Sequence, residues 1–79
     1  MNLENINKAK SLFYKGMEYL QENNYSYAEE KFLSALNLLP ERLSIVGNLF
    51  TIYFNTNNKD ELKNLLNNYK NYSSEKEIL

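Results

Sequence analysis

Two asparagine pairs, Asn23-Asn24 and Asn57-Asn58, lie 34 residues apart and interrupt an otherwise helical pattern of apolar residues. Asparagine tolerates the left-handed backbone conformation that ends a helix, so each pair predicts a tight turn. Elsewhere apolar residues recur every three or four positions, as on one face of a helix, and no stretch alternates over the length of a strand. This chain of 79 residues is therefore predicted to form one all-α domain.

The apolar pattern predicts four helices. The first should span about residues 3–22 and the second should end near residue 39, because Pro40 cannot lie inside a helix. The third and fourth helices carry apolar residues at helical spacing: Leu43, Val46, Leu49, Phe50, Tyr53 and Phe54, and then Leu62, Leu65, Leu66 and Tyr69.

Two S-x-x-E patterns are typical of a capping box, in which serine and glutamate side chains satisfy backbone N–H groups at a helix start. Ser26 and Glu29 predict the start of the second helix. Ser74 and Glu77 predict the start of a further helix one period after Pro40.

A shift by 34 residues tests the chain for internal repetition, because four similar helices would also fit an ordinary bundle. The shift places the two asparagine turns on each other, and it favours two stacked helical hairpins over the bundle. It also aligns Tyr19 with Tyr53, Ala28 with Leu62, and Phe32 with Leu66.

The spacing Gly16-x2-Tyr19, Ala28-x3-Phe32, Ala35 and Pro40 resembles the tetratricopeptide repeat family. The resemblance implies two stacked antiparallel hairpins in a single domain over 1–79, a fragment of an α-solenoid. The first repeat would span about 9–42, and the second, over 43–76, is degenerate. In the second, Phe50 replaces the glycine, Leu62 and Tyr69 replace the alanines, and Ser74 replaces the proline.

Small residues are expected where two antiparallel helices come closest. Gly16 and Ala28 would mark that point in the first hairpin, with Tyr19 and Phe32 filling the space beside them. The broad apolar girth of the first helix predicts that it packs between neighbours.

The resemblance implies a partner-binding groove on the concave face, lined by the first helix of each hairpin. Its aromatic and methionine side chains would suit an apolar peptide or helix. The alternative for Phe13 and Met17 is that they belong to the core. The groove residues would be Lys10, Phe13, Tyr14, Met17, Gln21, Ser44, Gly47, Asn48, Thr51 and Asn55.

Composition argues against other classes of function. The formal net charge of −1 gives no basic field for nucleic acid, and no apolar run is long enough for a signal or a membrane span. The chain has no cysteine and no histidine. We therefore expect no enzyme activity, catalytic residue, metal or cofactor, and a cytoplasmic location.

The expected function is a protein–protein interaction or assembly module with a protein or peptide partner. Two hairpins rarely bury enough surface alone, so a homodimer is expected, with Leu65, Tyr69 and Tyr72 facing the second copy. A short C-terminal cap formed by the last seven residues is the alternative cover. The other functional hypothesis is an N-terminal accessory domain of a larger enzyme such as a transferase.

Overall fold

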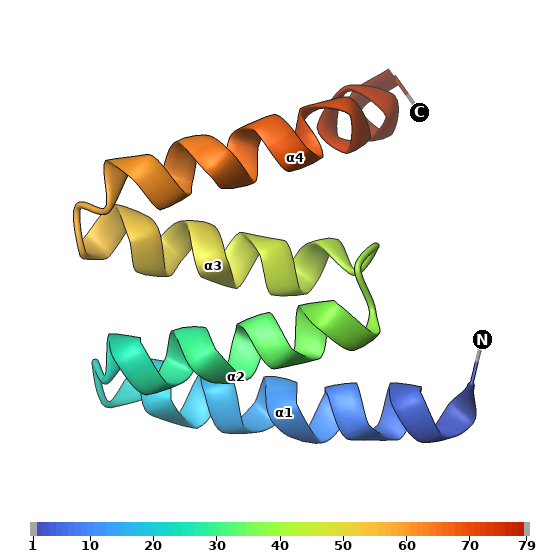
Figure 1. Ribbon diagram of the computed structural model, residues 1–79, viewed down its shortest axis with the longest axis vertical. Helices are drawn as coiled ribbons and strands as arrows, with labels where there is room; N and C mark the ends of the chain where they lie inside the picture. The colour runs from blue at the N-terminus through green and yellow to red at the C-terminus, as the bar shows by residue number, and fades with distance from the viewer. Residues whose placement is uncertain (1, 79) are drawn as a thin grey trace.

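The chain folds into a stack of four helices. A computed structural model describes the backbone of residues 2–78 and the side chains of residues 2–70. The helices are α1 (Leu3–Gln21), α2 (Tyr25–Leu38), α3 (Leu43–Asn55) and α4 (Lys59–Ile78). Residues 2–78 contain no strand, so the predicted all-α class is confirmed (Figure 1).

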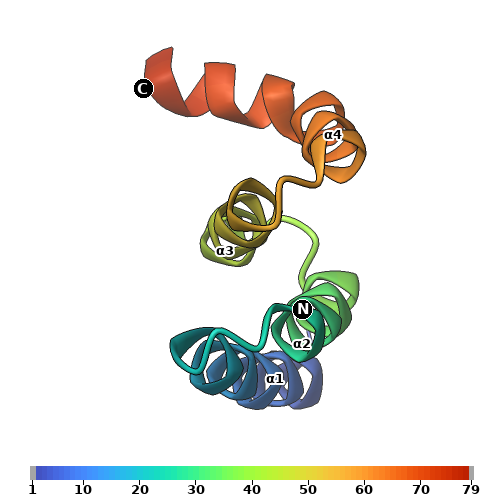
Figure 2. The same ribbon diagram turned by 90° about the vertical axis from the view of Figure 1, so that its left-hand side faces the viewer.

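Consecutive helices run antiparallel and lie next to one another in a zigzag. α1 packs against α2, α2 against α3, and α3 against α4 (Figures 1 and 2). The prediction that the first helix packs between neighbours is wrong, because α1 lies at one end of the stack and packs chiefly on α2. The apolar residues of α1 instead face α2 and the start of α3.

The two asparagine turns have the same backbone geometry. Asn23 and Asn57 both adopt left-handed backbone, with φ of 60° and 56°. In each turn the following asparagine donates its N–H, at 2.9 Å, to the carbonyl of the tyrosine five residues earlier, Tyr19 or Tyr53. This bond is the long one of a Schellman motif, which ends a helix at a left-handed residue. The 34-residue period is therefore present in the backbone as well as in the sequence.

The predicted capping box at Ser26 is wrong. α2 begins one residue earlier, at Tyr25, and Asn24 is its N-cap without a side-chain hydrogen bond. The Schellman turn sets this start, because it delivers the chain directly into a helical conformation. The N–H of Ala28 then donates to the carbonyl of Asn24 at 3.0 Å.

The predicted helix start at Ser74 is also wrong. α4 continues through Ser74 and Glu77 to Ile78 without a break. No proline or glycine follows Pro40 and Gly47 in the sequence, so nothing in this region forces the helix to end.

The core lies between the helices and is richest in the first hairpin and α3. Its buried members are Ala9, Ala28, Phe32, Ala35, Leu39, Ile45, Val46, Leu49, Ile52, Tyr53 and Leu65. Gly16 is buried as well, and a Cβ atom built there would lie 2.7 Å from the ring of Phe32. The glycine therefore leaves room for that ring.

Tyr53 is the one buried side chain in the described part of the chain with a clearly perturbed pKa. Burial raises the pKa of Tyr53 above its ordinary value. A hydrogen bond to the Glu29 carboxylate and the negative charges of Glu29 and Glu61 raise this pKa further. The folded state therefore holds the phenol in its neutral form.

This pKa predicts a loss of stability in alkali. Tyrosine ionises near pH 10 in the unfolded chain, and Tyr53 ionises only at higher pH in the folded chain. Below about pH 10 the stability that comes from the neutral Tyr53 phenol is fully present. Above about pH 10 the free energy of unfolding should fall by up to about 1.4 kcal/mol per pH unit, because only the unfolded chain loses the proton. Urea denaturation at about pH 8 and about pH 10.5 would measure the fall. Tyr53→Phe should remove most of it, and an unchanged fall in that variant would assign it to the other tyrosines.

Candidate functional site

An apolar cleft lies between the N-terminal half of α1 and the start of α3. It has a volume of about 180 Å³. α1 supplies one wall, and the end of α2, the turn and the start of α3 supply the other. The lining residues are Ile6, Ala9, Lys10, Phe13, Tyr14, Leu39, Arg42, Ser44 and Ile45.

Aromatic stacking fixes the wall that α1 supplies. The ring of Phe13 packs edge-on against buried Phe32, with centroids 5.7 Å apart. Tyr14 lies edge-on to Phe13 at 6.0 Å, yet 58 % of Tyr14 is exposed. A phenol held by a core-anchored ring and open to solvent is suited to contact a ligand, because little side-chain entropy is lost on binding.

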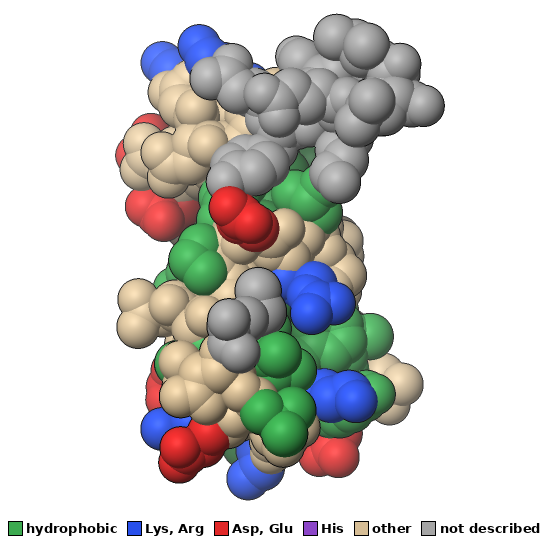
Figure 3. Space-filling view, turned by 90° about the vertical axis from the view of Figure 1, so that its right-hand side faces the viewer, with side chains coloured by type: hydrophobic (Ala, Val, Ile, Leu, Met, Phe, Trp, Pro, Cys, Tyr) green, Lys and Arg blue, Asp and Glu red, His purple; other side chains and the backbone are tan. Residues whose placement is uncertain are grey.

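The charge at the cleft is positive. Lys10 and Arg42 are exposed lining residues, Ser44 is neutral, and no carboxylate is among the described residues that line the cleft. Figure 3 views the side of the molecule that faces right in Figure 1, and on this side apolar side chains lie between lysine and arginine side chains. The arrangement can accept an apolar group next to an anionic one.

The predicted groove residues on α3 do not all line this cleft. Thr51 and Asn55 line a second cleft with Phe50 and Phe54, near the end of α3. The amide Nδ2 of Asn48 donates to the Ser44 carbonyl at 3.0 Å. The predicted groove is therefore divided into two separate hollows.

The remaining predicted groove residues on α1 have different surroundings. Met17 is partly buried and packs against the core, as Phe13 also does. Gln21 is exposed at the end of α1. The core interpretation thus holds for Met17 and in part for Phe13, which serves both the core and the cleft.

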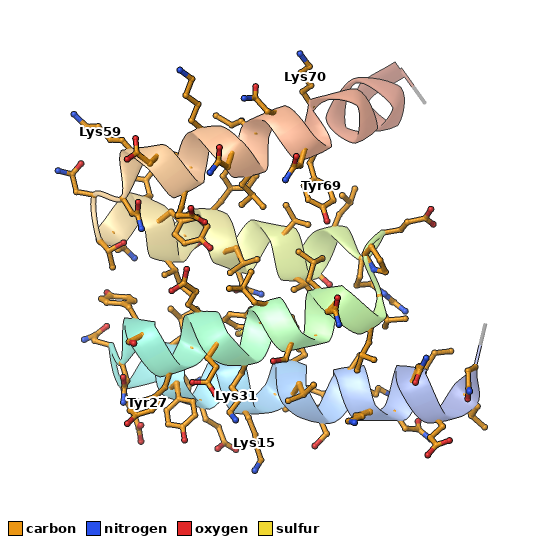
Figure 4. All side chains as sticks on the ribbon, viewed as in Figure 1. Lys15, Tyr27, Lys31, Lys59, Tyr69 and Lys70 are labelled. Carbon is orange, nitrogen blue, oxygen red and sulfur yellow. The ribbon has the colours of Figure 1, made fainter. Side chains whose placement is uncertain are left out.

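Leu65 and Tyr69, which were predicted to face a second copy of the chain, instead point into the molecule. Leu65 is only 7 % exposed and belongs to the core. Tyr69 points toward α3 (Figure 4), and its hydroxyl donates to the Pro40 carbonyl at 2.9 Å. The side chain of Tyr72 lies outside the described residues. Among the described side chains of α3 and α4, the large apolar ones that are exposed are Phe54, at 76 %, and Leu66, at 51 %.

Sequence reasoning missed Arg42, Phe54 and Leu66 as surface residues. Arg42 is the single arginine of the chain and follows the turn at Pro40, which was a usable signal. Leu65 and Leu66 are neighbours that point about 100° apart on a helix, so spacing alone leaves open which of them faces inward.

Comparison of the chain with protein-family models, curated proteins and solved structures gives no match. In the described part of the chain, no three histidine, cysteine, aspartate or glutamate side chains gather as a metal site would require. None of the described helices has the length and apolar character needed to cross a membrane.

Proposed function

We propose that this chain is a non-catalytic protein-binding module of the tetratricopeptide type that binds a peptide in the cleft between α1 and α3. The observation that carries the proposal is the exposed Tyr14 ring, anchored through Phe13 on the core and flanked by Lys10 and Arg42. The repeated Schellman turns and the Gly16–Phe32 contact support the repeat assignment.

The favoured ligand is a short peptide segment with an apolar side chain next to an acidic one. A cleft of about 180 Å³ accommodates one or two side chains and not a whole helix. The apolar part would pack on Tyr14 and Ile6, and the carboxylate would pair with Lys10 or Arg42.

A random-peptide display library is the direct test. Peptides selected on the wild-type chain should be enriched in acidic residues beside apolar or aromatic ones. Tyr14→Ala and Lys10→Glu should each weaken binding of the selected peptides by about tenfold, a loss typical of a contact residue at an interface.

Tyr27→Ala is the matched control, because Tyr27 is exposed to a similar extent, 54 %, but lies on α2. It should leave the affinity of the selected peptides unchanged. If Tyr27→Ala and Tyr14→Ala weaken binding equally, or if selection yields no peptide, the cleft is not the binding site.

A further inference from the structure

One stripe on α4 combines three lysines with an exposed leucine. Lys59, Lys63, Leu66 and Lys70 stand at positions i, i+4, i+7 and i+11, so they share one face of the helix. All four are exposed. Lys59 and Lys70 point away from α3, on the outer edge of the stack (Figure 4). None of the three lysines has an ion-pair partner among the described residues.

The internal period shows what this face corresponds to. A shift by 34 residues places the stripe on Tyr25, Glu29, Phe32 and Leu36 of α2. In the first hairpin, Tyr25 and Glu29 lie at the interface with the next helix, α3. Tyr25 and Glu29 line one hollow with Ile52 and Tyr53 of α3. Phe32 is fully buried and packs on Gly16 and Phe13 of α1, and Leu36 packs on the core.

Among the side chains that the structure describes, the same side of the second hairpin is exposed. Leu66, the counterpart of fully buried Phe32, is half exposed, and Phe54, the counterpart of partly buried Leu20, is largely exposed. Phe54 lines one cleft with Lys59 and Leu62. Leu62 lies one helical turn before Leu66. The apolar surface of α3 and the stripe of α4 are therefore continuous.

We propose that this face binds an acidic amphipathic helix of another protein, seated on the second hairpin as α3 is seated on the first. The apolar side of that helix covers Phe54, Leu62 and Leu66. Its acidic residues lie opposite the three lysines of α4. In the first hairpin Tyr53 of α3 lies in the same way opposite Glu29, the counterpart of Lys63. The positive charges of the three lysines favour a partner with negative charges at the edge of the interface.

The same lysines disfavour a second copy of the chain as the occupant. A two-fold dimer centred on Leu66 places the same surface on both sides, so the two sets of lysines would face each other. Like charges across an interface reduce binding. The homodimer expected from the sequence therefore requires a different surface.

The probe is a synthetic peptide of residues 43–58 that carries Val46→Glu, Tyr53→Glu and Asn57→Glu. Tyr53 faces Glu29, the counterpart of Lys63, and extending this antiparallel register places position 46 opposite Lys70 and position 57 opposite Lys59. Leu49 and Ile52 stay apolar in the peptide. A matched peptide carries lysine at the same three positions. Fluorescence anisotropy at about 50 mM and about 300 mM NaCl would report affinity and its salt dependence.

The glutamate peptide should bind at least about tenfold more tightly than the lysine peptide, and the difference should shrink at high salt. Lys63→Glu in the chain should weaken the glutamate peptide about tenfold and strengthen the lysine peptide. Lys15→Glu, on α1 at the other end of the stack, and Tyr14→Ala, in the first cleft, should change neither affinity. Because Tyr14→Ala affects only the cleft, failure of this proposal and failure of the peptide-binding function are distinguishable.

Equal binding of the two peptides overturns the proposal, as does an equal effect of Lys15→Glu and Lys63→Glu. Sedimentation of the free chain as a dimer that Leu66→Asp dissolves would assign the face to a second copy. Lys63-dependent binding to vesicles of phosphatidylserine and phosphatidylcholine, without binding of the glutamate peptide, would assign it to a membrane surface.

Discussion

Phe32→Ala is expected to lower the free energy of unfolding by about 3–5 kcal/mol. Phe32 is fully buried, its ring covers Gly16, and it supports Phe13 at the wall of the cleft. Truncation removes the largest buried ring of the first hairpin and leaves a cavity that the surrounding helices fill only in part. A domain of this size has about 3–5 kcal/mol in total, so the variant should be largely unfolded in water.

Urea denaturation followed by circular dichroism would measure this loss, with two variants as references. Phe32→Leu keeps most of the volume and should lose less than about 1.5 kcal/mol, which keeps a measurable transition. Leu33→Ala changes the next residue, which is exposed, and should shift stability by about 0.5 kcal/mol or less. Equal losses for Phe32→Ala and Leu33→Ala would mean that α2 presents a different face to the core.

The positions of the helices could be predicted because strong local signals set them. The left-handed asparagines end α1 and α3, and Pro40 follows the end of α2. Each of these signals acts through the conformational preference of one residue, which does not depend on the rest of the fold. The close approach at Gly16 was predictable for a similar reason, because only a residue without a side chain leaves room for the Phe32 ring.

The errors concern features that tertiary packing decides. Ser26 could cap a helix, but the Schellman turn had already started α2 at Tyr25. Spacing placed Leu62, Leu65, Leu66 and Tyr69 on one stripe of α4. That helix packs on a single neighbour, α3, among the described residues, which buries a narrower stripe and leaves Leu66 outside.

The candidate cleft was predicted in part. Lys10, Phe13 and Tyr14 were assigned together to the predicted groove, and they line one cleft. All three lie on α1, where the spacing of apolar residues indicates which face points inward. Arg42 and Leu39 join them only because the turn after α2 returns the chain to α1, a long-range feature that no local pattern contains. Thr51 and Asn55 were assigned to the same groove, but they line the hollow beside Phe54 instead.

The same substitution at the two glycines should have opposite effects. Both glycines are inside helices, where alanine is favoured by about 0.5–1 kcal/mol. Nothing lies within 4 Å of a Cβ at Gly47, so Gly47→Ala should stabilise the chain by that amount. At Gly16 the added Cβ lies 2.7–2.9 Å from three ring atoms of Phe32. Overpacking costs about 1–3 kcal/mol, which exceeds the gain, so Gly16→Ala should destabilise the chain.

Urea midpoints of the two variants, measured beside wild type, would decide this prediction, because helix propensity contributes equally to both. Phe32 cannot easily move away, since its ring is enclosed and packs on Phe13 at 5.7 Å. Shortening that side chain should relieve the clash, so Phe32→Leu should cost less in the Gly16→Ala background than in wild type. A rise in stability for Gly16→Ala equal to that for Gly47→Ala would show that the ring does not lie over Gly16. The pairing of α1 with α2, and with it the wall of the cleft at Phe13 and Tyr14, would then need a different register.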